Sequence, residues 1–198
     1  MLRKTLCLIS FFMLYMHVSR SQNPDAANCR RAEKEVLEVL NHIRAHPDVV
    51  LSKDLPHYLD SSETKKTAYV VSLMADLRKS KPSEILLRSA TLDSLAMQHA
   101  RDMGNTGKTG HTGSGGKTFS IRTRNIQQTV DHIAESLQYG YDKGSDIVMD
   151  LLIDEGVSGT GHRKQILDAN YKYVGIAVYP HKSIYRINTV IIYSSREP

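Results

Sequence analysis

Two histidines in glycine-rich segments are the residues of this chain whose types best suit chemistry. His111 lies within residues 110–113 (Gly-His-Thr-Gly), and His162 follows Gly-Thr-Gly, with the acids Glu135 and Asp154 between them in the sequence. Neutral imidazoles and carboxylates are good ligands for Zn²⁺ and similar divalent ions. A single histidine is more often a packed or surface residue. Four such side chains brought together could instead hold an ion.

Several short motifs surround these residues in a fixed order. They are LAMQHARDM (residues 95–103), HTG (111–113), AESL (134–137), GHRKQIL (161–167) and YVGIAV (173–178). In content, order and spacing they resemble the CAP superfamily, the secreted SCP-like domain of cysteine-rich secretory proteins, antigen 5 and pathogenesis-related proteins. The residues of these motifs are most similar to those of the cysteine-poor, bacterial-type branch. The resemblance covers about residues 36–192, and several motifs in order are more specific than any one of them.

The resemblance implies that His111, Glu135, Asp154 and His162 line one cleft. The histidines would be the metal ligands, and the two acids would be the catalytic pair if the protein is an enzyme. Two departures from the family pattern affect this cleft. Ser136 stands where relatives usually have Asn, and Asp154 is one methylene shorter than the usual Glu, with Glu155 as an alternative second acid. With only two strong histidine ligands, the expected cofactor is a weakly held divalent ion, Zn²⁺ by preference.

Three functions are compatible with such a cleft. The one we favour is a secreted binding module that takes an extracellular lipid, sterol or peptide. The second is a metal-dependent hydrolase or peptidase, in which the ion activates a bound water and Glu135 acts as general base. The third is a structural or adhesive domain with an idle cleft. No serine or cysteine lies in a triad-like frame, which disfavours a covalent hydrolase, and fold does not decide among the three.

Two further patterns receive structural interpretations. Residues 115–118 read Gly-Gly-Lys-Thr, but a phosphate-binding loop requires a glycine where His111 stands and a hydrophobic strand before it. We therefore expect a flexible loop that carries His111. His99 lies on the apolar face of an expected helix, so we interpret it as a packed, hydrogen-bonded histidine.

The N-terminal segment has the pattern of a secretory signal. Arg3 and Lys4 precede an apolar stretch over residues 6–18, and residues 19–21 offer small side chains for cleavage. The apolar stretch is shorter than the roughly 20 residues of a membrane span. We expect a signal peptide over residues 1–21, a polar lead over 22–31 and one CAP/SCP-like domain over 32–194. The product would be secreted, extracellular or periplasmic, without a stable membrane span; a retained signal anchor is the alternative.

Charge and cysteine content limit the partners. The formal net charge of +5 falls to about +2 once Arg3, Lys4 and Arg20 leave with the signal. No long run of like charges and no basic patch with interleaved aromatic residues occurs, so nucleic acid is not expected as a partner. Cys7 leaves as well, which excludes an intramolecular disulfide. We expect a monomer, with a dimer linked through Cys29 as the alternative.

Hydrophobic periodicity predicts the elements that must position the candidate site. Helical spacing indicates helices from Ala32 to about Ile43 and over residues 68–77, 92–103 and 146–153. Pro56 and the polar residues 60–62 favour a loop over residues 51–62. Residues 171–179 and 184–193 predict a β-hairpin. The pattern alone gives mixed α and β structure, whereas the resemblance implies an α+β fold: a three-layer α-β-α sandwich with a small antiparallel sheet between helical layers.

Overall fold

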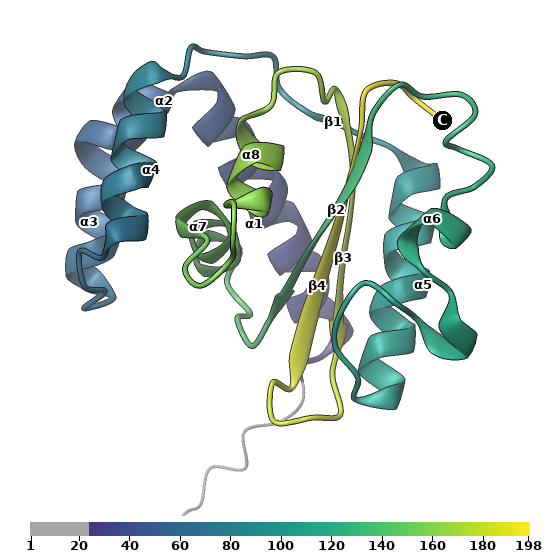
Figure 1. The fold of residues 1–198 in the computed structure, drawn as a ribbon. Coiled ribbons are helices and arrows are strands. Elements are labelled where there is room, and N and C mark those ends of the chain that lie inside the picture. Colours follow the sequence, from purple (N-terminus) through teal and green to yellow (C-terminus); the bar gives the residue numbers. More distant parts are fainter. Residues whose placement is uncertain (1–23) are drawn as a thin grey trace, which may run out of the picture.

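A four-stranded sheet lies between two layers of helices in the computed structural model of the chain, which describes residues 24–198 (Figure 1). The strands are β1 (Leu87–Arg88), β2 (Ile133–Tyr139), β3 (Tyr173–Pro180) and β4 (Ile187–Ser194), in the order β1-β3-β4-β2. β4 pairs antiparallel with both β2 and β3, whereas β1 pairs parallel with β3. The expected α+β sandwich is confirmed, and the sheet is antiparallel except at the two-residue β1.

Helices cover both faces of this sheet. α1 (Ala26–Ala45), α7 (Gly144–Ile153) and α8 (Gly161–Leu167) contribute to the core on one face, and α5 (Ala90–Thr106) to the core on the other. The remaining helical elements are α2 (Pro47–Val49), the π-helix η1 (Val50–Asp54), α3 (Leu55–Ser61), α4 (Ala68–Lys79), the 3-10 helix η2 (Ser114–Gly116) and α6 (Phe119–Arg122). Figure 1 places α3 and α4 outside α1 and α7, and α6 beside α5.

Alternation along the strands divides the apolar residues between two cores. Val174, Ile176 and Val178 of β3 face α1 and α7, as a strand with period two requires. On β4, Ile191 belongs to the same core and Ile192 to the core beneath α5. The central strands are therefore buried on both sides, which explains their nearly continuous apolar sequence.

The first helix begins earlier than its periodicity predicts. α1 starts at Ala26, where the Asp25 carboxylate accepts a hydrogen bond from the Asn28 amide at 2.8 Å and caps the helix. Most of the expected polar lead is thus helical, and Cys29 is a free, buried thiol of the core. Burial raises the pKa of this thiol. A buried, protonated thiol is poorly suited to an intermolecular disulfide.

The N-terminal signal lies outside the described residues. Within residues 24–198, no helix is both long enough and apolar enough to cross a membrane.

Three expectations about secondary structure were wrong or incomplete. The expected loop over residues 51–62 is helical (η1 and α3), and Pro56 lies in the first turn of α3, directly after the π-helix η1. Ile184 lies in the connection between β3 and β4 rather than in a strand. β2 was not expected as a strand, although it becomes an edge of the sheet.

Arg44, at the end of α1, joins segments that are distant in sequence. It is almost completely buried, and its guanidinium donates hydrogen bonds to the backbone carbonyls of Glu84, Ile166, Asp168 and Tyr171, at 2.7–3.1 Å. The connection from α8 to β3 and the segment before β1 are therefore fixed to the first helix through one side chain. Cys29, the cysteine within residues 24–198, is free, so this network links distant segments of the described domain by polar contacts instead of a disulfide.

Replacing Arg44 should destabilise the fold strongly. Arg44→Met removes the donor from four carbonyls, two of them in fully buried contacts, so we expect a loss of about 3 kcal/mol or more in the free energy of unfolding. Urea denaturation measures it. Arg31→Met on the same helix is the control, since Arg31 is exposed and makes only a surface pair with Glu35, worth about 0.5 kcal/mol. Equal losses in the two variants would contradict this role.

Candidate functional site

Asp154 and His162 form the first of two carboxylate–imidazole pairs. Asp154 follows the last residue of α7 in a left-handed conformation (φ 58°), which aspartate tolerates better than most residues. Its Oδ1 lies 2.8 Å from Nδ1 of His162, and its Oδ2 accepts the backbone N–H of His162 at 3.0 Å and that of Arg163 at 3.3 Å. The buried carboxylate thus fixes both the start of α8 and the ring of His162. Glu155 is exposed and has no such contact, so the second acid at the site is Asp154.

Arg163, the residue after His162, anchors the start of α8 to α7 and α4. Its side chain is buried and donates hydrogen bonds to the carbonyls of Leu152 and Ile153 at the end of α7 and of Tyr69 in α4. It also forms an ion pair with Asp76 at 2.9 Å. In the GHR motif, the arginine is therefore a structural residue, while the histidine before it is the partner of Asp154.

Glu135 and His111 form the second pair. Glu135 lies on β2 with its side chain 1% exposed, and its Oε1 is 2.9 Å from Nδ1 of His111. Nη2 of Arg122, in α6, donates to the same Oε1 at 2.9 Å and to the His111 carbonyl at 3.1 Å. Burial alone would raise the pKa of Glu135, but the hydrogen bonds from His111 and Arg122 outweigh it and lower that pKa. Glu135 is therefore an ionised carboxylate whose negative charge is balanced by the guanidinium of Arg122.

The loop that carries His111 is held by α5 and β2. The Gly110 amide donates to the Tyr139 hydroxyl at 3.0 Å, and Nε2 of His99 bonds the Gly110 carbonyl at 3.0 Å. Asp102 accepts the Ser114 amide at 2.6 Å on the other side of His111. His99 is buried and hydrogen-bonded, as expected, and burial lowers its pKa. The structural role of His99 is to anchor this loop. The loop was expected to be flexible, but three hydrogen bonds tie it to α5 and β2.

Ser136 links the edge strand to the other pair. Neighbouring residues of a strand point to opposite faces, so Glu135 faces α6 and the His111 loop while Ser136 faces α8. The Ser136 hydroxyl donates to Oε1 of Gln165 in α8 at 2.6 Å. β2 thus lies between the two pairs, with α7 and α8 on one side and α6 on the other (Figure 1).

The structure brings together each histidine with one acid, but it does not gather all four side chains into one cluster. Within residues 24–198, no three side chains of the types His, Cys, Asp and Glu lie close enough to hold a metal ion. The two rings differ in access, since the His111 side chain is 53% exposed and that of His162 is 19% exposed. For each ring, Nδ1 is the nitrogen that contacts the carboxylate.

Three residues that position this site were missed at the level of sequence. Arg122 and Tyr139 lie in none of the quoted motifs, and Asp102 lies in the motif of residues 95–103 but was given no role there. Each acts through the tertiary structure on a residue more than ten positions away. Arg122 also keeps Nε and Nη1 buried without hydrogen-bond partners, and Glu135 keeps its Oε2 in the same state. Buried polar atoms of this kind are usually satisfied by ordered water.

Comparison with known proteins gives one family match. Residues 71–193 match the model of the cysteine-rich secretory protein family. No curated protein sequence matches the chain significantly. A similar solved structure is that of an extracellular SCP-domain protein from Bacillus anthracis, with 15% identity over 65% of this chain and 39% of that chain and a TM-score of 0.47. An outer surface protein from Borrelia burgdorferi has 23% identity over 64% of this chain and 90% of that chain, with a TM-score of 0.47. A cysteine-rich secretory protein from Staphylococcus aureus has 12% identity over 87% of this chain and 41% of that chain, with a TM-score of 0.49. The chain thus spans about two fifths of the Bacillus and Staphylococcus proteins and most of the Borrelia protein.

The Asp102 contact predicts a pH dependence of the His111 loop. The hydrogen bonds from the Ser114 hydroxyl and amide hold the pKa of Asp102 below the ordinary value of 3.8. Because the folded pKa is lowered, the contact is intact above pH 3.8 and is lost as the pH falls through the lowered pKa. In an NMR titration, the Ser114 amide shift should change with a midpoint below pH 3.8.

This transition should be missing in Asp102→Asn. Asp131→Asn serves as control, since Asp131 pairs with Arg196 at the surface and should leave the Ser114 titration unchanged. Persistence of the transition in Asp102→Asn would contradict the assignment.

Proposed function

The chain belongs to the cysteine-rich secretory protein family, and we propose that it is a secreted binding protein whose His111 and His162 take up a divalent ion. The ligand of this cleft would be an extracellular lipid, sterol or peptide, bound without turnover. The expected signal at residues 1–21 supports secretion, and the two carboxylate–imidazole pairs support ion binding.

The contact of each carboxylate with Nδ1 is the observation that carries the proposal. A carboxylate accepts hydrogen bonds, so in the neutral form of each ring the proton belongs on Nδ1 and the lone pair on Nε2. A carboxylate behind a histidine in this way orients the ring and raises the basicity of its free nitrogen as a metal ligand. Among the described residues, neither Nε2 makes a hydrogen bond. Imidazole nitrogens of this kind are common Zn²⁺ ligands, and an ion held by these two alone would be bound weakly.

The state of Glu135 favours binding over hydrolysis. A general base must reach the water whose proton it takes. Oε1 of Glu135 already accepts from His111 and Arg122, and Oε2 is buried. The positive charge of Arg122 further reduces its affinity for a proton. These contacts make Glu135 a residue that positions His111 rather than a base, so the hydrolase is the second candidate.

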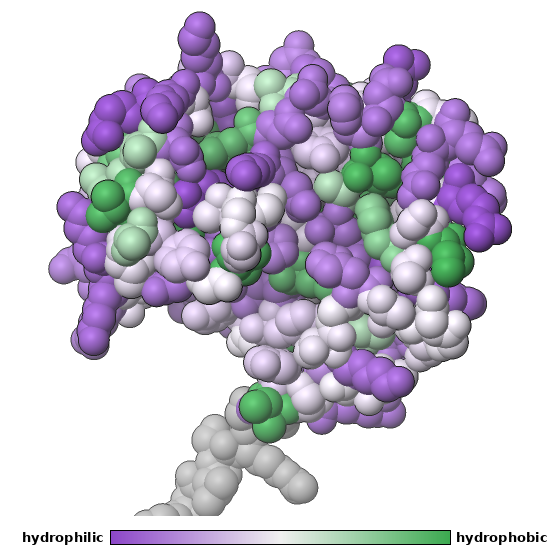
Figure 2. Space-filling view, in the orientation of Figure 1, coloured by the Kyte–Doolittle hydropathy of each residue, from purple (hydrophilic) through white to green (hydrophobic). Residues whose placement is uncertain are grey.

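Apolar surface close to the His111 pair supports a partly apolar ligand. α6 carries Ile121 next to Arg122, and the Ile121 side chain is about half exposed. Figure 2 shows apolar residues over α6 on an otherwise mostly hydrophilic face. A lipid, a sterol or an apolar peptide side chain could contact this surface while a polar group reaches His111.

Calorimetry with Zn²⁺ tests the proposed ion site. We expect weak binding by the wild-type protein and a loss of about tenfold or more in affinity for both His111→Ala and His162→Ala. Glu135→Gln should have a smaller effect, because the ligand nitrogen remains. Binding should also weaken in acid, since protonated imidazoles do not ligate metals.

His132→Ala is the matched control, because His132 is exposed at the start of β2 and contacts neither pair. Unchanged affinity in both His111→Ala and His162→Ala would rule out the shared ion site. If the protein hydrolyses an ester or peptide in the presence of Zn²⁺ and Glu135→Gln loses this activity, the protein is a hydrolase rather than a binding protein.

A further inference from the structure

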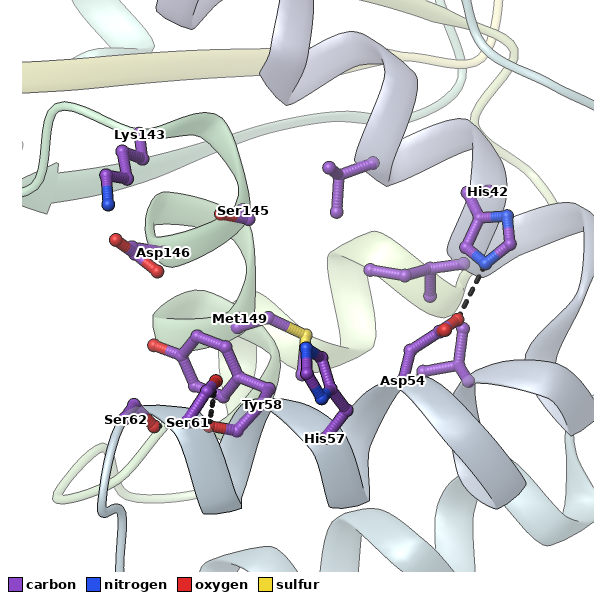
Figure 3. Close-up of a pocket in the computed structure, with 13 residues that line it drawn as sticks. His42, Asp54, His57, Tyr58, Ser61, Ser62, Lys143, Ser145, Asp146 and Met149 are labelled. Carbon is purple, nitrogen blue, oxygen red and sulfur yellow. Dashed lines mark hydrogen bonds and ion pairs between the residues drawn. The ribbon is translucent and has the colours of Figure 1, made fainter.

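A second cavity lies away from the two pairs, between helices on one side of the sheet. It has a volume of about 610 Å³ and is bounded by α1, by η1 and α3, and by α7 (Figure 3). This volume is within the range of roughly 300–1,000 Å³ that is typical of small-molecule sites. Its lining includes none of His111, Glu135, Asp154 and His162. A ligand here would therefore be independent of the proposed ion.

The floor of this cavity is apolar. Val39 and Ile43 of α1, Val50 of η1 and Met149 of α7 contribute to its lining. The π-helix η1 places Val50 and Asp54 in the same wall, and π-helical turns are frequent at functional sites. An alkyl chain or an aromatic ring would bury its surface against this floor.

Polar groups lie at two ends of the cavity. At one end, Nε2 of His42 contacts Oδ2 of Asp54 at 2.7 Å. Lys143 and Asp146 lie at the other end (Figure 3). The Asp54 carboxylate thus has a partner, whereas Asp146 has no hydrogen bond or ion pair within the described part of the chain. Asp146 is the carboxylate that is free to bind a ligand.

Asp146 acts electrostatically on the Tyr58 hydroxyl, which lines the same cavity. Burial raises the pKa of the Tyr58 hydroxyl to about 12, and the negative charge of Asp146 contributes to that rise, followed by Tyr141 and Asp150. Among the lining residues, two carboxylates face one ammonium, that of Lys143, so the lining is negative when both imidazoles are neutral. Lys143 is exposed to solvent. A ligand with a carboxylate would add a third negative charge, and one with an ammonium would balance the existing excess.

We propose that this cavity binds an amphipathic amine, whose ammonium group pairs with Asp146 while its apolar body lies on Val39, Ile43, Val50 and Met149. The Tyr58 ring adds an aromatic face close to the ammonium, which favours a cation. The proposal concerns a site separate from the cleft, so its outcome does not depend on the proposed ion binding.

Three probes with the same number of carbon atoms test the proposal by calorimetry: decylamine, decanoate and 1-decanol. We expect decylamine to bind at least tenfold more tightly than decanoate. Asp146→Asn should weaken decylamine binding by about tenfold, the loss expected for one charge-assisted hydrogen bond, and should leave binding of 1-decanol unchanged. Val39→Phe, which fills part of the floor, should weaken all three.

Asp142→Asn is the charge-matched control, since Asp142 is an exposed acid four residues before Asp146 and does not line the cavity. His111→Ala should also leave decylamine binding unchanged, which separates this site from the cleft. The proposal is overturned if decylamine does not bind, if decanoate binds as tightly as the amine, or if Asp146→Asn and Asp142→Asn have the same effect.

Discussion

Two buried carboxylates require partners, and the geometry of the candidate site follows from how they obtain them. The side chains of Glu135 and Asp154 are each 1% exposed, and an unpaired charge at such a position would be very costly. Glu135 is paired by Arg122 and His111, and Asp154 by His162 and the first amides of α8. In each case an imidazole completes the set of donors. The histidines are therefore oriented by the carboxylates, and their second nitrogens are left for another ligand.

The same use of buried polar contacts explains how the domain is held together without disulfides. Arg44 fixes α1 to the segments before β1 and β3, and Arg163 fixes α8 to α4 and α7. Both arginines donate mainly to backbone carbonyls, which have few other donors at irregular chain segments. Asn41 adds a two-way contact with the backbone of Leu86, donating to its carbonyl and accepting from its amide. Apart from the Arg163–Ile153 contact, these contacts join residues that are 40 or more positions apart in the sequence.

Sequence reasoning predicted the parts of this fold that depend on local periodicity. The helices that became α4, α5 and α7 follow from apolar spacing, and the resemblance supplied the layered fold and the identities of His111, Glu135, Asp154 and His162. β2 was missed because Glu135 and Ser136 interrupt its apolar pattern and find partners on opposite faces of the sheet. The role of Arg122 and the cavity between α1, α3 and α7 could not be predicted from the sequence. Both depend on contacts between elements that are distant in sequence, and no local pattern indicates such contacts. The helical segment after Pro47 was missed because its prolines were interpreted as breaks rather than as first-turn residues.

The protonation of the two imidazoles tests the central claim most directly. If the buried carboxylates hold both rings, then the neutral rings of His111 and His162 in the metal-free protein carry their proton on Nδ1 and leave Nε2 unprotonated. Long-range ¹H–¹⁵N correlation spectra, assigned with His111→Ala and His162→Ala, distinguish the two tautomers of a neutral ring. We predict the Nδ1–H form for both residues, with Glu135→Gln changing His111 alone. A predominant Nε2–H form at either histidine would contradict the account, because the nitrogen proposed as metal ligand would then carry the proton.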